Sequence, residues 1–283
     1  MMRLSLLGTG TPRPSIERQC TANLVQIGDV NIMVDAGRGA VAQLVNLGHD
    51  PVDIDYIFIT HHHFDHIGNL GDLIMAAWNN GRDRPVHIFG PDGTADIIDH
   101  LFAIYRRDIE FRLLEERVLG SPIPDIRDLL QVTHIVAGDG YQGDGWSVVA
   151  GQVEHGHGLG LSHEEWPCFG YRIMAGDKVL TISGDTIDCD GVRALAAGAD
   201  LLLQCCYLAE AEIDGREKRL LSDVVLASAK QASRIARAAG VGKMVLTHLA
   251  PKSDAMLQAA LEEACDGFTG EVVLGADLMV IDV

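Results

Sequence analysis

The sequence has no long apolar run, no CxxC cysteine pair and no excess of basic residues. No stretch approaches the roughly 20 apolar residues that a membrane-spanning helix needs, and Met1–Gly8 is too soon interrupted for a signal peptide. Lys and Arg number 22 against 40 Asp and Glu, a net charge of −18. This balance disfavours nucleic acid and anionic membranes as partners, because phosphate contact needs Lys and Arg. We therefore expect a cytoplasmic protein.

The cysteines and the length set further limits. None of the six cysteines forms a CxxC pair, and adjacent Cys205 and Cys206 lie in an apolar run, so we expect buried free thiols in a reducing compartment. The 283 residues, 47% of them hydrophobic, allow a sizeable core. Since there is no internal repeat and no low-complexity linker, we predict a single domain spanning residues 1–283.

The most informative stretch is the polar cluster Thr60–Gly68. It follows Asp55–Ile59, whose aromatic and β-branched residues predict a buried strand. Four candidate metal ligands, His61, His63, Asp65 and His66, fall within six residues. Imidazole and carboxylate together suit zinc and related first-row ions. Without a cation, ligands packed this closely would be costly to remove from water.

This H-x-H-x-D-H pattern after a strand resembles the signature of the metallo-β-lactamase superfamily. The loop Gly8–Pro14, G-T-G-T-P-x-P, is similar to the opening of the ribonuclease Z and arylsulfatase branch of that superfamily. It is not a phosphate-binding P-loop, because the G-K-[ST] ending is absent.

Three further residues match the family pattern, each directly after a predicted strand: His155 in V-E-H, Asp185 in S-G-D-T and His248 in L-T-H-L. The resemblance implies two ions, one held by His61, His63 and His155, the other by Asp65, His66 and His248, with Asp185 as the bridge. His157 is an alternative to His155, and His163 is a weaker one. Asp35 either supports the metal site from behind or caps the next segment.

Strand-rich and helix-containing stretches recur in both halves of the chain. This fits the α/β four-layer αβ/βα sandwich that the resemblance implies. A helix is predicted over 94–107, and a second one is predicted to be capped by Ser222 and closed by Gly240. The looser pattern at about 106–141 predicts an insertion that covers the active site, mediates dimerisation or forms a solvated excursion.

The resemblance also implies a chemistry. Two divalent metal ions, Zn²⁺ with Mn²⁺ or Fe²⁺ as alternatives, lower the pKa of a water and polarise an ester-like oxygen. We assign Asp65 as the catalytic residue that orients this nucleophile or acts as its base. The acid for the leaving group is not identified: His157 and Tyr207 are candidates, but a packing role is favoured for Tyr207.

The sequence departs from ribonuclease Z at two positions. Ribonuclease Z carries a glutamate where Cys205 stands and a histidine where Leu226 stands, and this chain also lacks a glycine- and lysine-rich arm. With the acidic charge, these differences favour an arylsulfatase-like or phosphodiesterase-like zinc hydrolase of a small-molecule substrate: a phosphodiester, a sulfate ester or a lactone. A ribonuclease Z-type tRNA 3′-end endonuclease is the alternative. A third hypothesis is a redox enzyme of the same superfamily with a di-iron site. Such an enzyme is expected to carry a flavin-binding domain as well. The resemblance further implies a homodimer.

Overall fold

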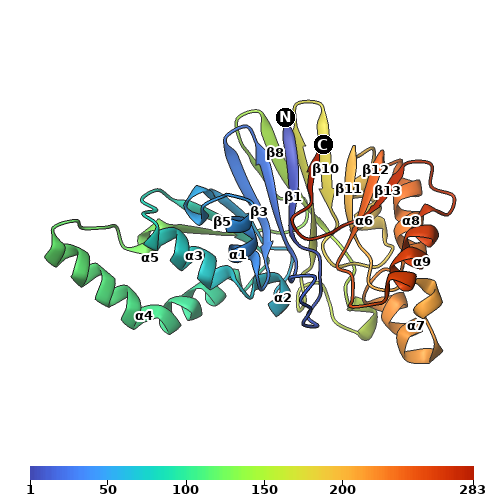
Figure 1. Ribbon diagram of the computed structural model, residues 1–283, viewed down its shortest axis with the longest axis horizontal. Helices are drawn as coiled ribbons and strands as arrows, with labels where there is room; N and C mark the ends of the chain where they lie inside the picture. The colour runs from blue at the N-terminus through green and yellow to red at the C-terminus, as the bar shows by residue number, and fades with distance from the viewer.

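Two seven-stranded sheets packed face to face form the centre of the molecule (Figure 1). The computed structural model describes all 283 residues. The first sheet has the strand order β14-β1-β2-β3-β4-β5-β6, and the second has the order β13-β12-β11-β10-β9-β8-β7. The strands of the first sheet are β1 (Met2–Gly8), β2 (Ala22–Ile27), β3 (Val30–Ala36), β4 (Tyr56–Phe58), β5 (Val86–Gly90), β6 (Leu130–His134) and β14 (Val280–Asp282). Those of the second are β7 (Gly140–Gln142), β8 (Trp146–Gln152), β9 (Phe169–Ala175), β10 (Lys178–Ile182), β11 (Leu201–Cys205), β12 (Lys243–Thr247) and β13 (Glu271–Leu274).

Helices cover the outer face of each sheet, which confirms the predicted four-layer αβ/βα sandwich. The first sheet carries α1 (Ala40–Asn46), α2 (Phe64–Ile67), α3 (Leu70–Asn79), α4 (Thr94–Leu119) and α5 (Ile126–Leu129). The second carries α6 (Asp190–Ala196), α7 (Gly215–Val224), α8 (Ala229–Ala239) and α9 (Asp254–Cys265). Short 3₁₀ turns lie at Pro51–Asp53, His157–Leu159 and Glu210–Glu212. None of the helices combines the length and the hydropathy needed to cross a bilayer.

Each sheet is buried on both faces because its strands are apolar on both sides. In β3, Ile32 and Val34 belong to the cluster between the sheets, whereas Met33 packs in the layer under α1 and α3. A third apolar cluster lies under α6, α8 and α9. Parallel strands covered by helices show this near-continuous apolar pattern. The burial holds the strand ends, and the loops that follow them, in fixed positions.

Two predicted helix boundaries are wrong. Helix α4 does not end at Arg107 but continues to Leu119, because Arg106–Glu110 and Asp108–Arg112 form supporting pairs one turn apart. It ends at Gly120, whose φ of 81° is left-handed. Ser222 does not cap the later helix. It lies inside α7, and α8 begins after Ser228.

The stretch 106–141, predicted as an insertion, contains several elements. They are the second half of α4, helix α5, edge strand β6 beside β5, and β7 beside β8. All six cysteines are free, as predicted. Four of them are buried, Cys189 is half-buried and Cys265 is exposed.

Candidate metal centre

The seven candidate ligands meet at one edge of the sandwich, where strands of both sheets end. The cluster His61–His66 follows β4, and His155, Asp185 and His248 follow β8, β10 and β12. They form two groups of converging ligand atoms: His61, His63, His155 and Asp185, and Asp65, His66 and His248. The carboxylate of Asp185 lies between the groups. Its Oδ2 is 3.8 Å from His155 Nε2 in the first and 3.2 Å from His248 Nε2 in the second.

Hydrogen bonds fix which nitrogen of three histidines carries the proton. His66 Nδ1 donates to Asp35 (2.7 Å) and His155 Nδ1 donates to the carbonyl of Val225 (2.7 Å). Carboxylate and carbonyl oxygens only accept, so in the neutral ring the Nε2 atoms of His66 and His155 carry the free lone pairs. The hydroxyl of Thr60 donates to Asp35 and therefore accepts from Nδ1 of His61. All three free Nε2 atoms point into the cluster.

In the first group, three imidazole nitrogens converge. His63 Nδ1 lies 2.9 Å from His61 Nε2 and 3.2 Å from His155 Nε2. Burial and the neighbouring His66 and His155 lower the pKa of His61 well below its usual range. Burial together with His155 also lowers the pKa of His63 to about 4. The free lone pairs of His61 Nε2 and His155 Nε2 both face His63 Nδ1, and a cation held among the three nitrogens would be bound by all of them.

The second group holds buried polar atoms without any hydrogen-bond partner. They are Asp65 Oδ1, His66 Nε2 and His248 Nδ1. Burial opposes the charge of Asp185, but His248 and His66 outweigh it and hold the pKa of this carboxyl well below its usual range. A buried carboxylate and unpaired imidazole nitrogens are costly in an apolar interior. The donor set therefore fits metal ions in both groups.

Asp35 supports the cluster from behind, which decides between its two predicted roles. It accepts hydrogen bonds from the Thr60 backbone N–H (2.8 Å), the Thr60 hydroxyl (2.8 Å) and His66 Nδ1. Its φ of 63° is left-handed, a conformation that Asp and Asn adopt more readily than most residues. It does not cap the following helix, whose N-terminal position is Gly39.

Two supporting residues were not predicted. The indole of Trp166 packs against the rings of His63 and His61, with centroids 4.7 and 5.9 Å apart. Val225 acts only through its backbone carbonyl on His155. Neither role can be recognised in the sequence. Every residue has a backbone carbonyl like that of Val225, and the position of the Trp166 ring depends on the fold.

His157, the predicted alternative to His155, lies outside the two groups. Its Nδ1 accepts from the His155 backbone N–H (3.0 Å) and its Nε2 donates to the Trp166 carbonyl (2.9 Å). It belongs instead to a third cluster with Glu154 and His163. Both of its nitrogens are engaged, so it holds the backbone on either side of the centre. It has no free lone pair or proton to offer a substrate.

Cys205 and Leu226, which replace the glutamate and the histidine of ribonuclease Z, pack together in one small apolar cluster. Cys205 is buried and its thiol donates to the Thr186 carbonyl. The two positions are therefore neighbours in space, but they contain no group that exchanges a proton near neutral pH.

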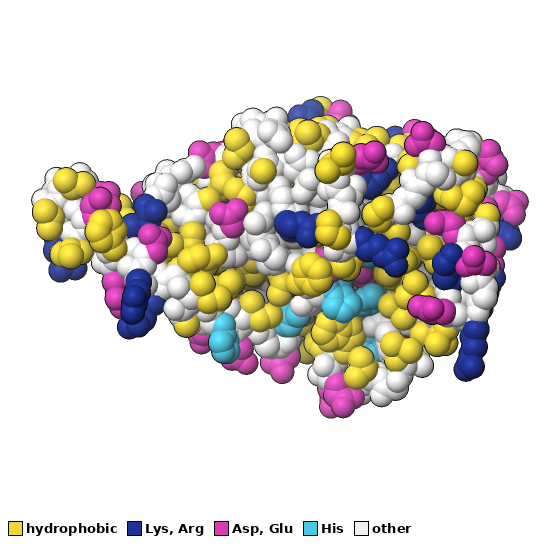
Figure 2. All heavy atoms as spheres, turned by 60° about the horizontal axis from the view of Figure 1, so that its bottom comes forward, with side chains coloured by type: hydrophobic (Ala, Val, Ile, Leu, Met, Phe, Trp, Pro, Cys, Tyr) yellow, Lys and Arg dark blue, Asp and Glu magenta, His cyan; other side chains and the backbone are white.

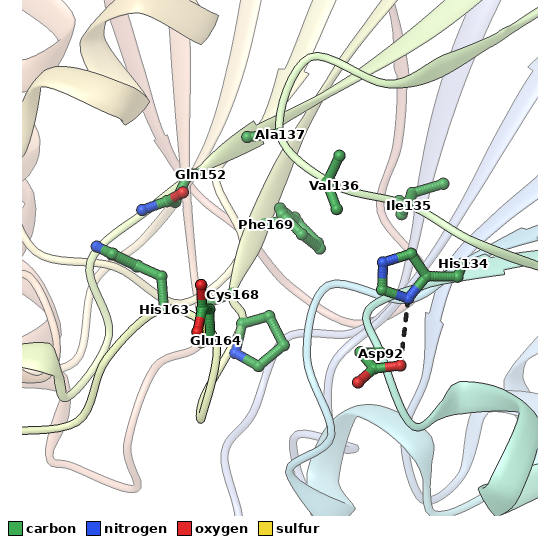
Figure 3. A pocket seen from close by; sticks show the side chains of 11 residues that line it. Asp92, His134, Ile135, Val136, Ala137, Gln152, His163, Glu164, Cys168 and Phe169 are labelled. Atoms are coloured by element: carbon green, nitrogen blue, oxygen red, sulfur yellow. Dashed lines mark ion pairs between the residues drawn. The ribbon is translucent and has the colours of Figure 1, made fainter.

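Two cavities adjoin the centre. The first has about 300 Å³ and is lined by Ile135, Val136, Cys168 and Phe169, with the His134–Asp92 pair at its edge (Figure 3). Pro167 and Cys168 connect this wall to Trp166 beside the histidines. When the lower edge of the sandwich faces the viewer, histidine side chains are visible among apolar ones (Figure 2).

The second cavity has about 390 Å³, and its lining contains two cations, Arg13 and Lys218, together with two carboxylates, Glu212 and Glu217. Tyr207, which also lines it, stacks near His248 with ring centroids 6.1 Å apart. The neighbouring Val225 is the residue that binds His155. The centre therefore adjoins one largely apolar cavity and one cavity whose lining carries charges of both signs.

Comparison with known proteins agrees with this geometry. Residues 30–249 match the family described as "Beta-lactamase superfamily domain". This chain belongs to the metallo-β-lactamase superfamily. It is therefore a hydrolase, as predicted. It is 30% identical to a protein named ribonuclease Z from Mycobacterium bovis, over 100% of this chain and 99% of that protein.

Solved structures share the fold. The metallo-β-lactamase fold protein YhfI from Bacillus subtilis has a TM-score of 0.75 at 20% identity, and the alignment covers 99% of this chain and 98% of that one. The short form of human tRNase Z (ELAC1) has a TM-score of 0.74 at 21% identity, covering 99% of both chains.

These relatives correct two predictions. The expected small-molecule ester substrate and the exclusion of nucleic acid as a partner are both wrong, because full-length relatives are ribonucleases. Both predictions relied on total charge, and the substrate prediction relied also on Cys205, Leu226 and the missing glycine- and lysine-rich arm. Net charge is summed over the whole surface, whereas phosphate contact depends on local cations such as Arg13 and Lys218.

Proposed function

We propose that this chain is a metal-dependent endoribonuclease of the ribonuclease Z type, which cleaves precursor tRNA near its 3′ end. The full-length similarity to ribonuclease Z supports this activity. The observation that carries it is the convergence of the seven ligand side chains on one edge, with free nitrogen lone pairs facing one another.

We assign the ligands as the family resemblance implies. One ion would be held by His61, His63 and His155 and the other by Asp65, His66 and His248, with Asp185 between the two groups. Histidine and carboxylate ligands favour zinc, although manganese and iron accept the same set. When bound, two such cations lower the pKa of a water and polarise the phosphoryl oxygen of the scissile bond.

The chain's own residues complete the site. Asp65 has one carboxylate oxygen, Oδ1, without a protein partner, which suits it to orient the attacking water. Trp166 covers one side of His61 and His63 and limits the access of bulk water. Cys205 and Leu226 provide no acid, and His157 has no free nitrogen. The Tyr207 hydroxyl is therefore the remaining candidate of the two predicted leaving-group acids.

The two cavities suggest how RNA is bound. We propose that Arg13, which lines the second cavity beside Tyr207, contacts a phosphate of the RNA next to the centre. The apolar walls of the other cavity, Ile135, Val136 and Phe169, suit a nucleobase. We also propose a cytoplasmic location, a homodimer, and one domain with an insertion at about 106–141.

The test is cleavage of a precursor tRNA that carries a 3′ trailer, with mature tRNA as the control substrate. The metal-loaded protein should cut the precursor once, near the end of the acceptor stem. Asp185→Asn and His63→Ala should lose the activity. Arg13→Ala should raise KM more than it lowers kcat, because Arg13 contacts RNA outside the centre. Intact precursor in the presence of fully metal-loaded protein would contradict the proposal.

A further inference from the structure

The first cavity has apolar walls and, at one end, an amide and a carboxylate without partners in the protein. Gln152 is half-buried and Glu164 is exposed, and neither side chain forms a hydrogen bond or an ion pair. Figure 3 shows them at one end of the cavity, away from the His134–Asp92 pair at the other. The walls come from Ile135–Ala137, which follows β6, and from Pro167–Phe169, which enters β9. The volume of about 300 Å³ is sufficient for one small planar ligand.

Both ends of the cavity lie beside loops that carry the first ligand group. Gln152 is the last residue of β8 and stands three residues before the ligand His155. At the other end, Asp92 is followed by Gly93, and a Cβ atom on Gly93 would lie 3.6 Å from the ring of His62. In the chain, His62 stands between two of the ligands. A nucleotide whose phosphate lies at the centre can therefore place its base in this cavity.

We propose that this cavity binds an adenine base, that of a nucleotide next to the scissile phosphate, an inference that rests on the proposed function. The Gln152 amide offers one acceptor and one donor group, and the Glu164 carboxylate only accepts. Glutamine pairs bidentately with adenine, because it accepts from the amino group and donates to the ring nitrogen N7. The second hydrogen of the amino group is then available to Glu164.

The same two groups disfavour uracil and guanine. On the corresponding edge, uracil presents a carbonyl oxygen and guanine presents O6 beside N7, so both bases offer acceptors there. An acceptor that faces the Glu164 carboxylate gains no hydrogen bond and is repelled by its charge. The apolar walls contact the faces of the base, which are similar in all bases. Discrimination between bases therefore depends on Gln152 and Glu164.

Precursor tRNAs with adenosine or purine riboside on either side of the cleaved bond, exchanged one position at a time, test the contact. Purine riboside lacks only the amino group, so kcat/KM should fall about fivefold or more at one of the two positions. The advantage of adenosine should disappear in Gln152→Leu and shrink in Glu164→Ala, a change at an exposed position. It should persist in the matched control Gln258→Leu, exposed on α9. Equal cleavage of both RNAs, or an advantage that survives Gln152→Leu, would overturn the inference.

Binding of free nucleotides separates this inference from the proposed function. Metal-loaded protein should bind adenosine monophosphate about fivefold or more tightly than purine riboside monophosphate, and Gln152→Leu should bind both equally. If every RNA stays intact but this difference is found, the proposed function is wrong and the cavity binds the adenine of a free nucleotide. If RNA is cleaved without any preference for adenosine, the proposed function stands and the adenine site is wrong. Intact RNA together with equal binding of the two monophosphates would overturn both.

Discussion

Replacing Asp35 with asparagine should loosen one of the two metal groups without disturbing the fold. Asp35 accepts three hydrogen bonds, two from Thr60 and one from His66 Nδ1. Asparagine has one acceptor oxygen and one donor nitrogen. If the nitrogen faces His66, the histidine must accept at Nδ1 and carry its proton on Nε2. That proton would occupy the lone pair that points toward Asp65 and Asp185.

The alternative orientation of the amide is no better. It would place two donors together, the asparagine nitrogen and the Thr60 backbone N–H. Losing a hydrogen bond to a charged group costs about 1.5–3 kcal/mol. Changing a residue that orients a ligand from behind weakens metal affinity about 10- to 100-fold, which corresponds to about 1.4–2.7 kcal/mol. Asparagine tolerates the left-handed φ of 63°, so backbone strain adds little.

The assay is metal content after equilibration in buffers of graded free zinc. Asp35→Asn should lose one ion per chain at a free zinc concentration 10- to 100-fold higher than the unmodified protein. The matched control is Asp55→Asn, since Asp55 pairs with Arg82 and Arg84 instead of a histidine. It should keep both ions. Equal affinity in Asp35→Asn, with His66 in the same tautomer by nitrogen NMR shifts, would refute the reasoning.

Three further outcomes follow from the same structure. Cys205→Glu should lower the free energy of unfolding by about 3–5 kcal/mol in urea titrations, because it buries an unpaired carboxylate. The double variant Cys205→Glu/Leu226→His should lose less unfolding free energy than Cys205→Glu alone. Thiol labelling of the folded protein should modify exposed Cys265 first and leave Cys206 intact, since burial raises the pKa of Cys206 to about 12. Loading stripped protein with zinc at pH 7 should release a proton from His66. Burial opposes its charge, but Asp185 and Asp35 raise its pKa well above the usual range, so the stripped state is protonated. Calorimetry in buffers of different ionisation enthalpy would show no released proton if this shift is absent.

The sequence predicted the architecture through its resemblance to a known superfamily, and the structure brings the seven predicted ligands together. Apolar strands followed by histidine or aspartate place those side chains at sheet edges, and His155 fits this rule better than His157 because it stands next to the strand end. The supporting contacts could not be predicted. The carbonyl of Val225 and the ring of Trp166 act through tertiary placement alone.

Helix limits were less predictable for a similar reason. Residues 106–119 combine many charges with few buried positions, so their pattern resembles a surface loop. Pairs such as Asp108–Arg112, and the absence of Gly or Pro before Gly120, keep them helical. Substrate was the least predictable property. It depends on a few cations near one cavity, and total charge does not report their position.

Anomalous diffraction at the zinc edge, from crystals of metal-loaded protein, tests the central claim most directly. The account predicts two peaks per chain, one among His61, His63 and His155 and one among Asp65, His66 and His248, with Asp185 within bonding distance of both. A map with no peak at these positions, or with its strongest peak at Glu154, His157 and His163, would contradict it.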